Sequence, residues 1–266
     1  PVGGYAQEES EQSVSYLKAI ALAESLSPEE KVGQLFLITF DGSEISPESD
    51  VYQMIADYNI GGVVLKSENN NFSDSDTARV TFELISTLQS IDWAQQQDLP
   101  VSPKLSYFNG YIPLFIGISQ LGGSYPYDQM INGVTPAPSQ MAVGATWDPA
   151  NAQAIGKMIG SQLEPMGFNL YFGPSIDVLD IAYGKGEENL GVRTFGGDPY
   201  WVGEMGAAYI SGIHQGSDNR ISVIAKNFPG RGSSDRLPEE GVATVRKSLE
   251  QLKLIELAPF FKVTDL

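Results

Sequence analysis

Short apolar runs alternate with longer amphipathic stretches along this chain, and this alternation constrains the fold more than any other feature. The apolar runs are rich in Ile, Val, Leu and Phe, and they occupy residues 37–40, 62–66, 114–118, 169–173 and 222–226. Strands that are buried on both faces have this composition, and intervening helices are typical of a parallel sheet covered by helices. The sequence therefore predicts an α/β fold with about five to six strand–helix units and parallel strands. The alternation alone fits both a closed barrel and an open doubly wound sheet.

The helical stretches carry their own start and stop signals. Ser27 can cap a helix that has Pro28 in its first turn, and Glu30 completes a capping box. A last helix is expected over 241–261, broken at Pro259 because proline lacks a backbone donor. The other predicted helices cover residues 46–59, 74–97, 148–167 and 198–215.

The segments that follow the later strands are long and rich in Gly, Pro and polar residues. They comprise residues 119–141, 176–197 and 227–241, whereas helix-to-strand connections such as 57–62 and 164–169 are short. Ligand sites of parallel α/β proteins lie at the carboxyl ends of the strands, in barrels and in open sheets alike. We therefore expect the functional residues in the three long loops.

The charge and the composition exclude several functions. The formal net charge is −17, with 33 acidic and 16 basic residues, which disfavours binding to nucleic acid or to anionic membranes and favours a neutral ligand. The chain has no cysteine and a single histidine, His214, so thiolate and histidine metal sites are excluded and no cofactor is expected.

The sequence predicts one domain after a polar start. Residues 1–26 resemble a flexible leader of the kind that remains after signal cleavage, which favours an exported or extracellular protein. Residues 27–266 show no linker, and no apolar run is long enough to span a membrane.

Several motifs in these segments occur in one characteristic order. They are "SPEEKVGQLF", "NIGGVVL", "PLFIGIS", the stretch 144–178, "NLGVRTFGGDP", "AKNFPGRG" and "ELAPF". In this order they resemble the amino-terminal barrel domain of glycoside hydrolase family 3, over residues from about 27 to 262. The resemblance implies a TIM-type (β/α) barrel that is incomplete in this chain. It also implies a retaining mechanism with an aspartate nucleophile and a separate acid/base, and substrates with β-linked glucose or N-acetylglucosamine.

The resemblance also identifies candidate substrate-binding residues. Arg193 matches a family arginine that contacts the substrate, and Lys226 matches the lysine of the family signature "KHFPGHG". Asn227 replaces the histidine after that lysine, and Ser119 stands where the family has an aspartate that holds two sugar hydroxyls. Together with Asp177 these residues are predicted to bind a carbohydrate. In the alternative interpretation, Arg193 and Lys226 form structural ion pairs with acids such as Asp177.

The catalytic groups depart furthest from the family pattern. Arg231 replaces the histidine of "GHG", and the loop "SSDRLPEE" lacks the histidine that serves as acid/base in the N-acetylglucosaminidase branch. Asp235 and Glu239 are carboxyl residues of this loop, and they are the candidates for that role. The family nucleophile lies on a later strand, beyond Leu266. We therefore expect that a carboxyl-terminal portion or another chain completes the barrel, and that residues 1–266 alone are inactive.

Three functions remain open at this point. The first is an O-glycosyl hydrolase whose nucleophile lies outside residues 1–266. The second is a non-catalytic, carbohydrate-binding or structural surface protein derived from such an enzyme. The third is an unrelated α/β binding module.

Overall fold

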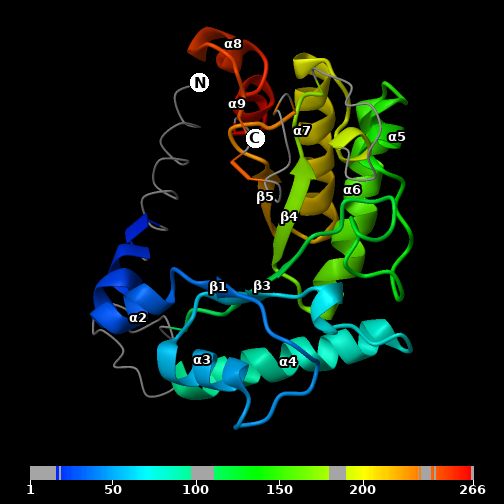
Figure 1. The fold of residues 1–266 in the computed structure, drawn as a ribbon. Coiled ribbons are helices and arrows are strands. Elements are labelled where there is room, and N and C mark those ends of the chain that lie inside the picture. The colour runs from blue at the N-terminus through cyan, green and yellow to red at the C-terminus, as the bar shows by residue number, and fades with distance from the viewer. Residues whose placement is uncertain are drawn as a thin grey trace, which may run out of the picture. The chain divides into compact units, whose positions relative to one another are not determined.

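The computed structural model describes residues 16–17, 19–96, 111–179, 190–232, 234, 241–242 and 244–264 (Figure 1). Its residues group into two compact units. The first unit comprises Pro1–Val64 and Glu83–Phe115, and the second comprises Leu65–Phe82 and Ile116–Leu266. Each unit is described by itself below.

Five strands form one sheet in the order β1-β2-β3-β4-β5. They are β1 (Leu37–Ile38), β2 (Gly62–Val64), β3 (Phe115–Ile118), β4 (Leu170–Ser175) and β5 (Ser222–Lys226). The pairs β1–β2, β3–β4 and β4–β5 are parallel. Between β2 and β3, Phe115 N–H donates to the Gly61 carbonyl and Leu65 N–H to that of Gly117, so the residue numbers of the two strands rise together. The predicted α/β class and all five predicted parallel strands are confirmed.

In the first unit, helices α2 (Pro28–Gly33) and α3 (Asp50–Tyr58) meet through a close backbone approach. A Cβ atom on Gly33 would lie 1.9 Å from the Tyr58 carbonyl oxygen, so the contact requires glycine. Gln34 Nε2 donates to the Asn59 carbonyl at 2.9 Å and fixes the end of α2 against the turn that leads to β2. The predicted capping box of α2 is present, since Ser27 and Glu30 each hold the other's backbone N–H.

The start of β3 is held in the first unit by the long helix α4 (Thr77–Gln96). The Gln96 side chain donates to the Ile112 carbonyl at 3.0 Å and accepts from the Ile112 N–H at 2.8 Å. Gln89 Nε2 donates to the Leu114 carbonyl at 2.9 Å. Helix side chains therefore complete the backbone hydrogen bonding of the segment that enters the sheet. Next to them, burial raises the pKa of Asp92 to about 6.

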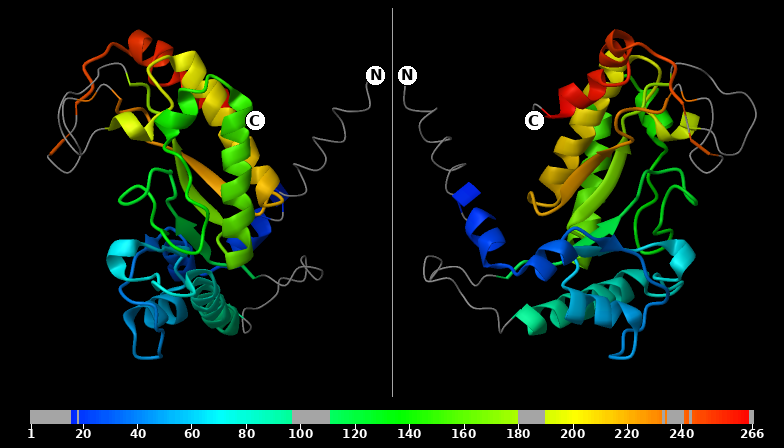
Figure 2. Two further views of the ribbon diagram at one scale, coloured as in Figure 1. Left: turned by 90° about the vertical axis from the view of Figure 1, so that its right-hand side faces the viewer. Right: turned by 60° about the vertical axis from the view of Figure 1, so that its left-hand side comes forward.

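In the second unit, helices α6 (Pro149–Leu163) and α7 (Pro199–Gly216) run side by side, and α7 packs on β4 and β5 (Figures 1 and 2). Each helix begins at an aspartate: Asp148 accepts from Ala150 N–H at 2.9 Å, and Asp198 accepts from Trp201 N–H at 3.0 Å. Proline in the first turn of both helices needs no hydrogen-bond partner there. The two backbones nearly touch, because a Cβ on Gly156 would lie 2.1 Å from the Tyr209 carbonyl oxygen.

Shorter elements complete the second unit. They are η1 (Ser67–Asn69), α5 (Gln140–Gly144), η3 (Glu164–Met166), η4 (Leu190–Arg193), α8 (Leu249–Leu254) and α9 (Ala258–Thr264). Within the described residues, no helix is long and apolar enough to cross a lipid bilayer. The described residues also contain no group of three or more His, Cys, Asp or Glu side chains placed to hold a metal ion.

The prediction of one helix over 241–261 was wrong. The described residues before Ser248 are not helical, and α8 begins at Leu249 because Ser248 and Gln251 form a capping box. The helical stretch is interrupted between Leu254 and Ala258, and Pro259 lies in the first turn of α9 rather than at the break. A proline is tolerated in a first turn because its missing N–H has no intrahelical partner in any case.

Gly156→Ala tests the close packing of α6 on α7. The added methyl group meets the Tyr209 carbonyl, so the helices must separate, and we expect a loss of about 1–3 kcal/mol in the free energy of unfolding. Urea denaturation followed by tryptophan fluorescence measures this loss. Lys157→Ala, at the exposed next position of α6, is the control and should change stability by less than about 0.5 kcal/mol. Equal stability of the two variants would contradict the described crossing.

Candidate active site

The carboxyl ends of β3, β4 and β5 lie together in the second unit and carry polar residues. Ser119 follows β3, Asp177 follows β4, and β5 ends at Lys226, which Asn227 follows. The register of β4 against β5 shifts between Phe172 and Ser175, so that Ser175 pairs with Lys226. Parallel pairing brings the ends of the strands to one edge, and the shift places the residues after β4 beside the last residue of β5.

Four of the five predicted site residues form direct hydrogen bonds in pairs. Lys226 Nζ donates to Ser119 Oγ at 3.2 Å, which joins the end of β5 to the end of β3 across β4. Asn227 Nδ2 donates to Asp177 Oδ2 at 2.6 Å. The structure thus gathers Ser119, Asp177, Lys226 and Asn227 at one edge of the sheet. Their role in binding a substrate stays a prediction.

Asp177 is fully buried and is the hub of this group. Its Oδ2 also accepts from Ser175 Oγ at 2.9 Å, and its Oδ1 accepts the backbone N–H of Arg231 at 2.7 Å. The Arg231 Nε lies 4.0 Å from Oδ2. A buried carboxylate is tolerable only when hydrogen bonds and a counter-charge replace its water. Asp177 therefore ties the turn after β5 to the end of β4.

Arg193 is the fifth predicted residue and lies at the end of η4. Its guanidinium stands 4.9 Å from the ring centroid of Tyr127, an arrangement typical of a cation–π contact. The Thr194 hydroxyl donates to the backbone carbonyl of Asp177 and so fixes the segment next to Arg193 against β4. Tyr127 and the Arg231 backbone were missed as site components from sequence. They lie in the loops after β3 and β5. No local sequence motif predicts that Tyr127 contacts Arg193 or that the Arg231 backbone contacts Asp177.

The electrostatics of the group show that its cations are close together. Burial lowers the pKa of Lys226 to about 8, and the positive charges of Arg231 and Arg193 contribute to this shift, while Asp177 opposes it. Nearby positive charges disfavour the protonated form of Lys226 because like charges repel one another. Burial disfavours it as well, because the charged group loses its hydration. Lys226 therefore lies close enough to Arg193 and Arg231 for their positive charges to repel its own.

The loop after β3 is folded by its own buried hydrogen bonds. The Asp128 carboxylate accepts from the backbone N–H groups of Gly122 at 2.7 Å and Ser124 at 3.0 Å. The Gln120 side chain exchanges two hydrogen bonds with the Met130 backbone, at 2.7 and 3.1 Å. The Tyr171 hydroxyl, which belongs to β4, donates to the Gln120 carbonyl. These contacts fix the loop that carries Tyr127 against the end of β3.

The turn after β5 depends on two glycines that flank Arg231. A Cβ on Gly232 would lie 1.8 Å from the Val178 carbonyl oxygen, and Gly230 adopts a positive φ of 120° with Glu256 packed against it. Glu256 is itself buried and forms an ion pair with Lys247 at 2.9 Å. The turn is therefore clamped between the end of β4 and the segment between α8 and α9, and Arg231 projects from a fixed backbone.

Two further predicted residues are not placed by the structure. Asp235 and Glu239, the candidates for the acid/base, lie outside the described residues. Their role stays a prediction.

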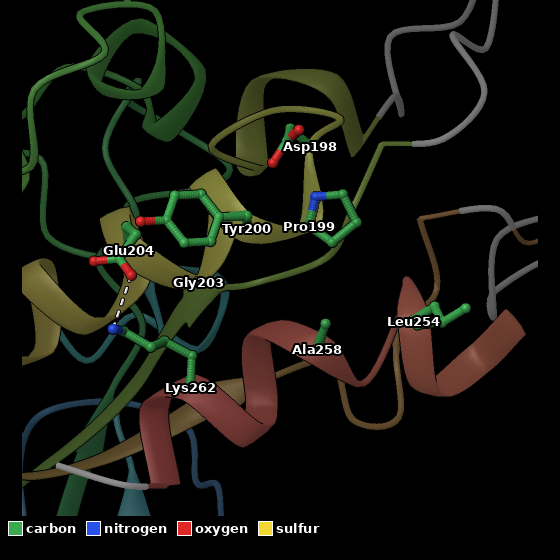
Figure 3. Close-up of a pocket in the computed structure, with 8 residues that line it drawn as sticks. All are labelled: Asp198, Pro199, Tyr200, Gly203, Glu204, Leu254, Ala258 and Lys262. Carbon is green, nitrogen blue, oxygen red and sulfur yellow. Dashed lines mark ion pairs between the residues drawn. The ribbon is translucent and has the colours of Figure 1, made fainter. Parts of the chain in front are cut away.

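A separate hollow of about 470 Å³ is lined by residues of α7, α8 and α9 (Figure 3). Within it, Lys262 Nζ and Glu204 Oε1 form an ion pair at 2.8 Å. The lining residues are Asp198, Pro199, Tyr200, Gly203, Glu204, Leu254, Ala258 and Lys262, none of which belongs to the group around Asp177. The ion pair connects α9 to α7 and neutralises the two charges that face each other in the hollow.

Asp177→Asn tests whether the carboxylate organises the group. The amide keeps the shape of the side chain but removes the negative charge that faces Arg231. It also replaces one of the two acceptor oxygens by an NH2 group, which then faces a hydrogen-bond donor. We expect a loss of about 3–5 kcal/mol in the free energy of unfolding, the usual cost of breaking a buried pair. The measurement is urea denaturation, with the exposed Asp57→Asn as a control for the loss of one negative charge. A loss below about 1 kcal/mol would show that Asp177 is not the hub.

Comparisons with known proteins agree with the fold and with the sequence motifs. The model for the "Glycosyl hydrolase family 3 N terminal domain" matches residues 27–265. "Beta-hexosaminidase A" of Pseudoalteromonas piscicida is 26% identical over 219 residues, which are 80% of this chain and 32% of that protein. "Beta-N-acetylglucosaminidase/beta-glucosidase" of Cellulomonas fimi is 30% identical over 213 residues, which are 79% of this chain and 31% of that protein.

A solved structure shows the same architecture. It is a family 3 β-N-acetylglucosaminidase from a Paenibacillus strain, with a TM-score of 0.75 and 30% identity over 90% of this chain and 40% of that one. This chain spans about a third of the length of the two curated relatives. The match of the family model over nearly the whole chain shows that the chain belongs to glycoside hydrolase family 3 and corresponds to the amino-terminal domain of that family.

Proposed function

We propose that this chain supplies the sugar-binding part of a retaining β-glycosidase that removes terminal β-linked N-acetylglucosamine or glucose from glycans. The observation that carries the proposal is the grouping of Ser119, Lys226 and Asn227 with the Asp177 hub at one edge of the sheet. The names of the relatives, which are β-hexosaminidases and a β-N-acetylglucosaminidase/β-glucosidase, support this class of substrate.

The chemistry of the group suits a polyhydroxylated ligand. A lysine ammonium offers three donors and an arginine guanidinium offers five, while an asparagine amide both donates and accepts. Sugar hydroxyls can accept from such donors and donate to such acceptors in several directions at once. Lys226 and Arg231 are partly accessible rather than sealed, so their remaining donors can face a bound sugar.

Asp177 serves as a positioning residue rather than as the nucleophile. Retaining hydrolysis requires two carboxyl groups about 5–5.5 Å apart on either side of the glycosidic bond. The Asp177 carboxylate is fully buried, and its oxygens are occupied by donors from Ser175, Asn227 and Arg231. It cannot reach an anomeric carbon without breaking the hydrogen bonds that hold the group together. The nucleophile is therefore sought elsewhere in the whole protein, and Asp235 and Glu239 remain the candidates for the acid/base.

Lys226→Met tests the sugar-binding role in the whole protein. Loss of a charged hydrogen bond of about 1.5–3 kcal/mol should lower kcat/KM by roughly 10- to 150-fold for 4-methylumbelliferyl β-N-acetylglucosaminide or β-glucoside. Lys157→Met, on the exposed surface of α6, is the matched control and should leave kcat/KM unchanged. An unchanged kcat/KM for Lys226→Met would place the sugar elsewhere.

Residues 1–266 alone should not hydrolyse these substrates. We expect the family nucleophile to lie beyond Leu266; without it no covalent glycosyl-enzyme forms, and acid assistance by itself contributes only about 10²–10⁴-fold. Fluorescence assays with purified residues 1–266 measure the release of methylumbelliferone. Turnover above background that Lys226→Met abolishes would refute this expectation and would reveal another pair of carboxylates.

A further inference from the structure

Three aromatic side chains form a cluster at the start of α7, apart from the group around Asp177. Trp147 lies just before α6, and Tyr200 and Trp201 belong to the first turn of α7. The ring centroids of Trp147 and Trp201 are 5.2 Å apart, and those of Tyr200 and Trp201 are 6.0 Å apart. Trp147 is 60% exposed and Tyr200 is 68% exposed. Large aromatic side chains that meet at the surface are typical of a binding surface.

The backbone of Trp147 is an independent sign that this side chain has a role in binding. Its φ is +53°, in the left-handed region that glycine adopts freely and a bulky residue adopts only at a cost. The side chain is mostly exposed, so burial repays little of that cost. Stability alone would therefore favour glycine at this position. A large aromatic residue held in a strained conformation at the surface points to function.

The hollow between α7, α8 and α9 adjoins the aromatic cluster, because Tyr200 belongs to both (Figure 3). Its volume of about 470 Å³ lies within the range of about 300–1,000 Å³ that is usual for ligand pockets. Apolar groups of Pro199 and Leu254 line it together with the ion pair of Glu204 and Lys262. An ammonium beside a carboxylate offers hydrogen-bond donors and acceptors side by side.

This combination of groups matches the chemistry of a β-linked glucose or N-acetylglucosamine chain. The ring substituents of these sugars are equatorial, so both faces of the ring carry only C–H groups and are apolar. The rim of the ring carries hydroxyls, which both donate and accept hydrogen bonds. Aromatic rings can cover the faces while a neighbouring donor and acceptor bind the rim. The chain belongs to a glycoside hydrolase family, so a carbohydrate is a ligand of the expected class.

We propose that the hollow and the aromatic cluster form a second carbohydrate-binding surface, which binds neutral β-linked oligosaccharides of glucose or N-acetylglucosamine. The inference goes beyond the proposed function and does not depend on the role of Lys226. Asp198, which caps α7, follows Arg193 by five residues in the sequence. The Cα atoms of these two residues are therefore at most about 18 Å apart. The second surface is thus a near neighbour of the candidate active site within the same unit.

Oligosaccharides of different linkage test the proposal in the whole protein carrying Lys226→Met. This substitution weakens the proposed site at the strand ends and slows hydrolysis of the probes. Chitotetraose, cellotetraose and maltotetraose are titrated by calorimetry at pH 7. We expect the two β-linked probes to bind at least about tenfold more tightly than maltotetraose, whose α-linked chain curves away from a line of aromatic rings.

Substitutions in the aromatic cluster are then compared in the same background. Tyr200→Ala and Trp147→Gly should each weaken binding of chitotetraose by at least about tenfold, as truncation of an aromatic anchor does. Trp147→Phe keeps a ring and should retain binding to within about threefold. Tyr58→Ala removes an exposed tyrosine at the end of α3 and is the control, with unchanged binding. Thermal melts show whether each variant is folded, and glycine suits the backbone at position 147.

Each outcome supports or overturns the proposal. Unchanged binding of chitotetraose in both Tyr200→Ala and Trp147→Gly overturns it, and so does a failure of every probe to bind. Equal binding of maltotetraose overturns the assignment to β-linked chains. An equal loss in Trp147→Phe and Trp147→Gly contradicts the role of the aromatic ring. The proposed function is judged separately by kcat/KM of Lys226→Met, so that either conclusion can fail while the other stands.

Discussion

The buried carboxylate of Asp177 is the interaction on which the geometry of the site depends. It accepts hydrogen bonds from the end of β4, from the residue after β5 and from the backbone of the turn beyond. Without such an acceptor, the turn at Arg231 would leave polar groups buried and unsatisfied. The shifted register between β4 and β5 is what brings the carboxylate to this place, since it aligns Ser175 with Lys226. The strand pairing and the buried Asp177 carboxylate together determine where the side chains of Lys226 and Arg231 lie.

Much of the fold could be predicted from sequence because strand burial leaves a strong local signal. The apolar run 169–173 is an example, and the structure has the buried strand β4 there. The start of α8 was missed because the apolar period continues upstream of Ser248, whereas the capping box decides the boundary. The helical periodicity therefore predicted that a helix is present in this region, whereas the capping side chain of Ser248 determines that α8 begins at Leu249.

The candidate site was predictable only in part, for a different physical reason. Lys226 and Asn227 end a recognisable strand, and Ser119 follows another, so their proximity follows from parallel pairing. The contact of Arg193 with Tyr127 joins residues of two loops, and no spacing in the sequence encodes it. The hydrogen bond from Arg231 to Asp177 uses a backbone N–H, which every residue but proline possesses. Sequence therefore indicated which strand ends carry the site but not how the loops close around it.

The clamped turn at Gly230 and Gly232 has a consequence for how this site can diversify. Glu256 packs against Gly230 and forms an ion pair with Lys247. The turn is therefore held in place by residues that do not belong to the group around Asp177. Substitutions there can tilt the Arg231 backbone without altering a single contact side chain. Homologues with identical strand-end residues can therefore differ in where the side chain at position 231 lies, and the residues that support the turn form a second set of positions at which this geometry can change.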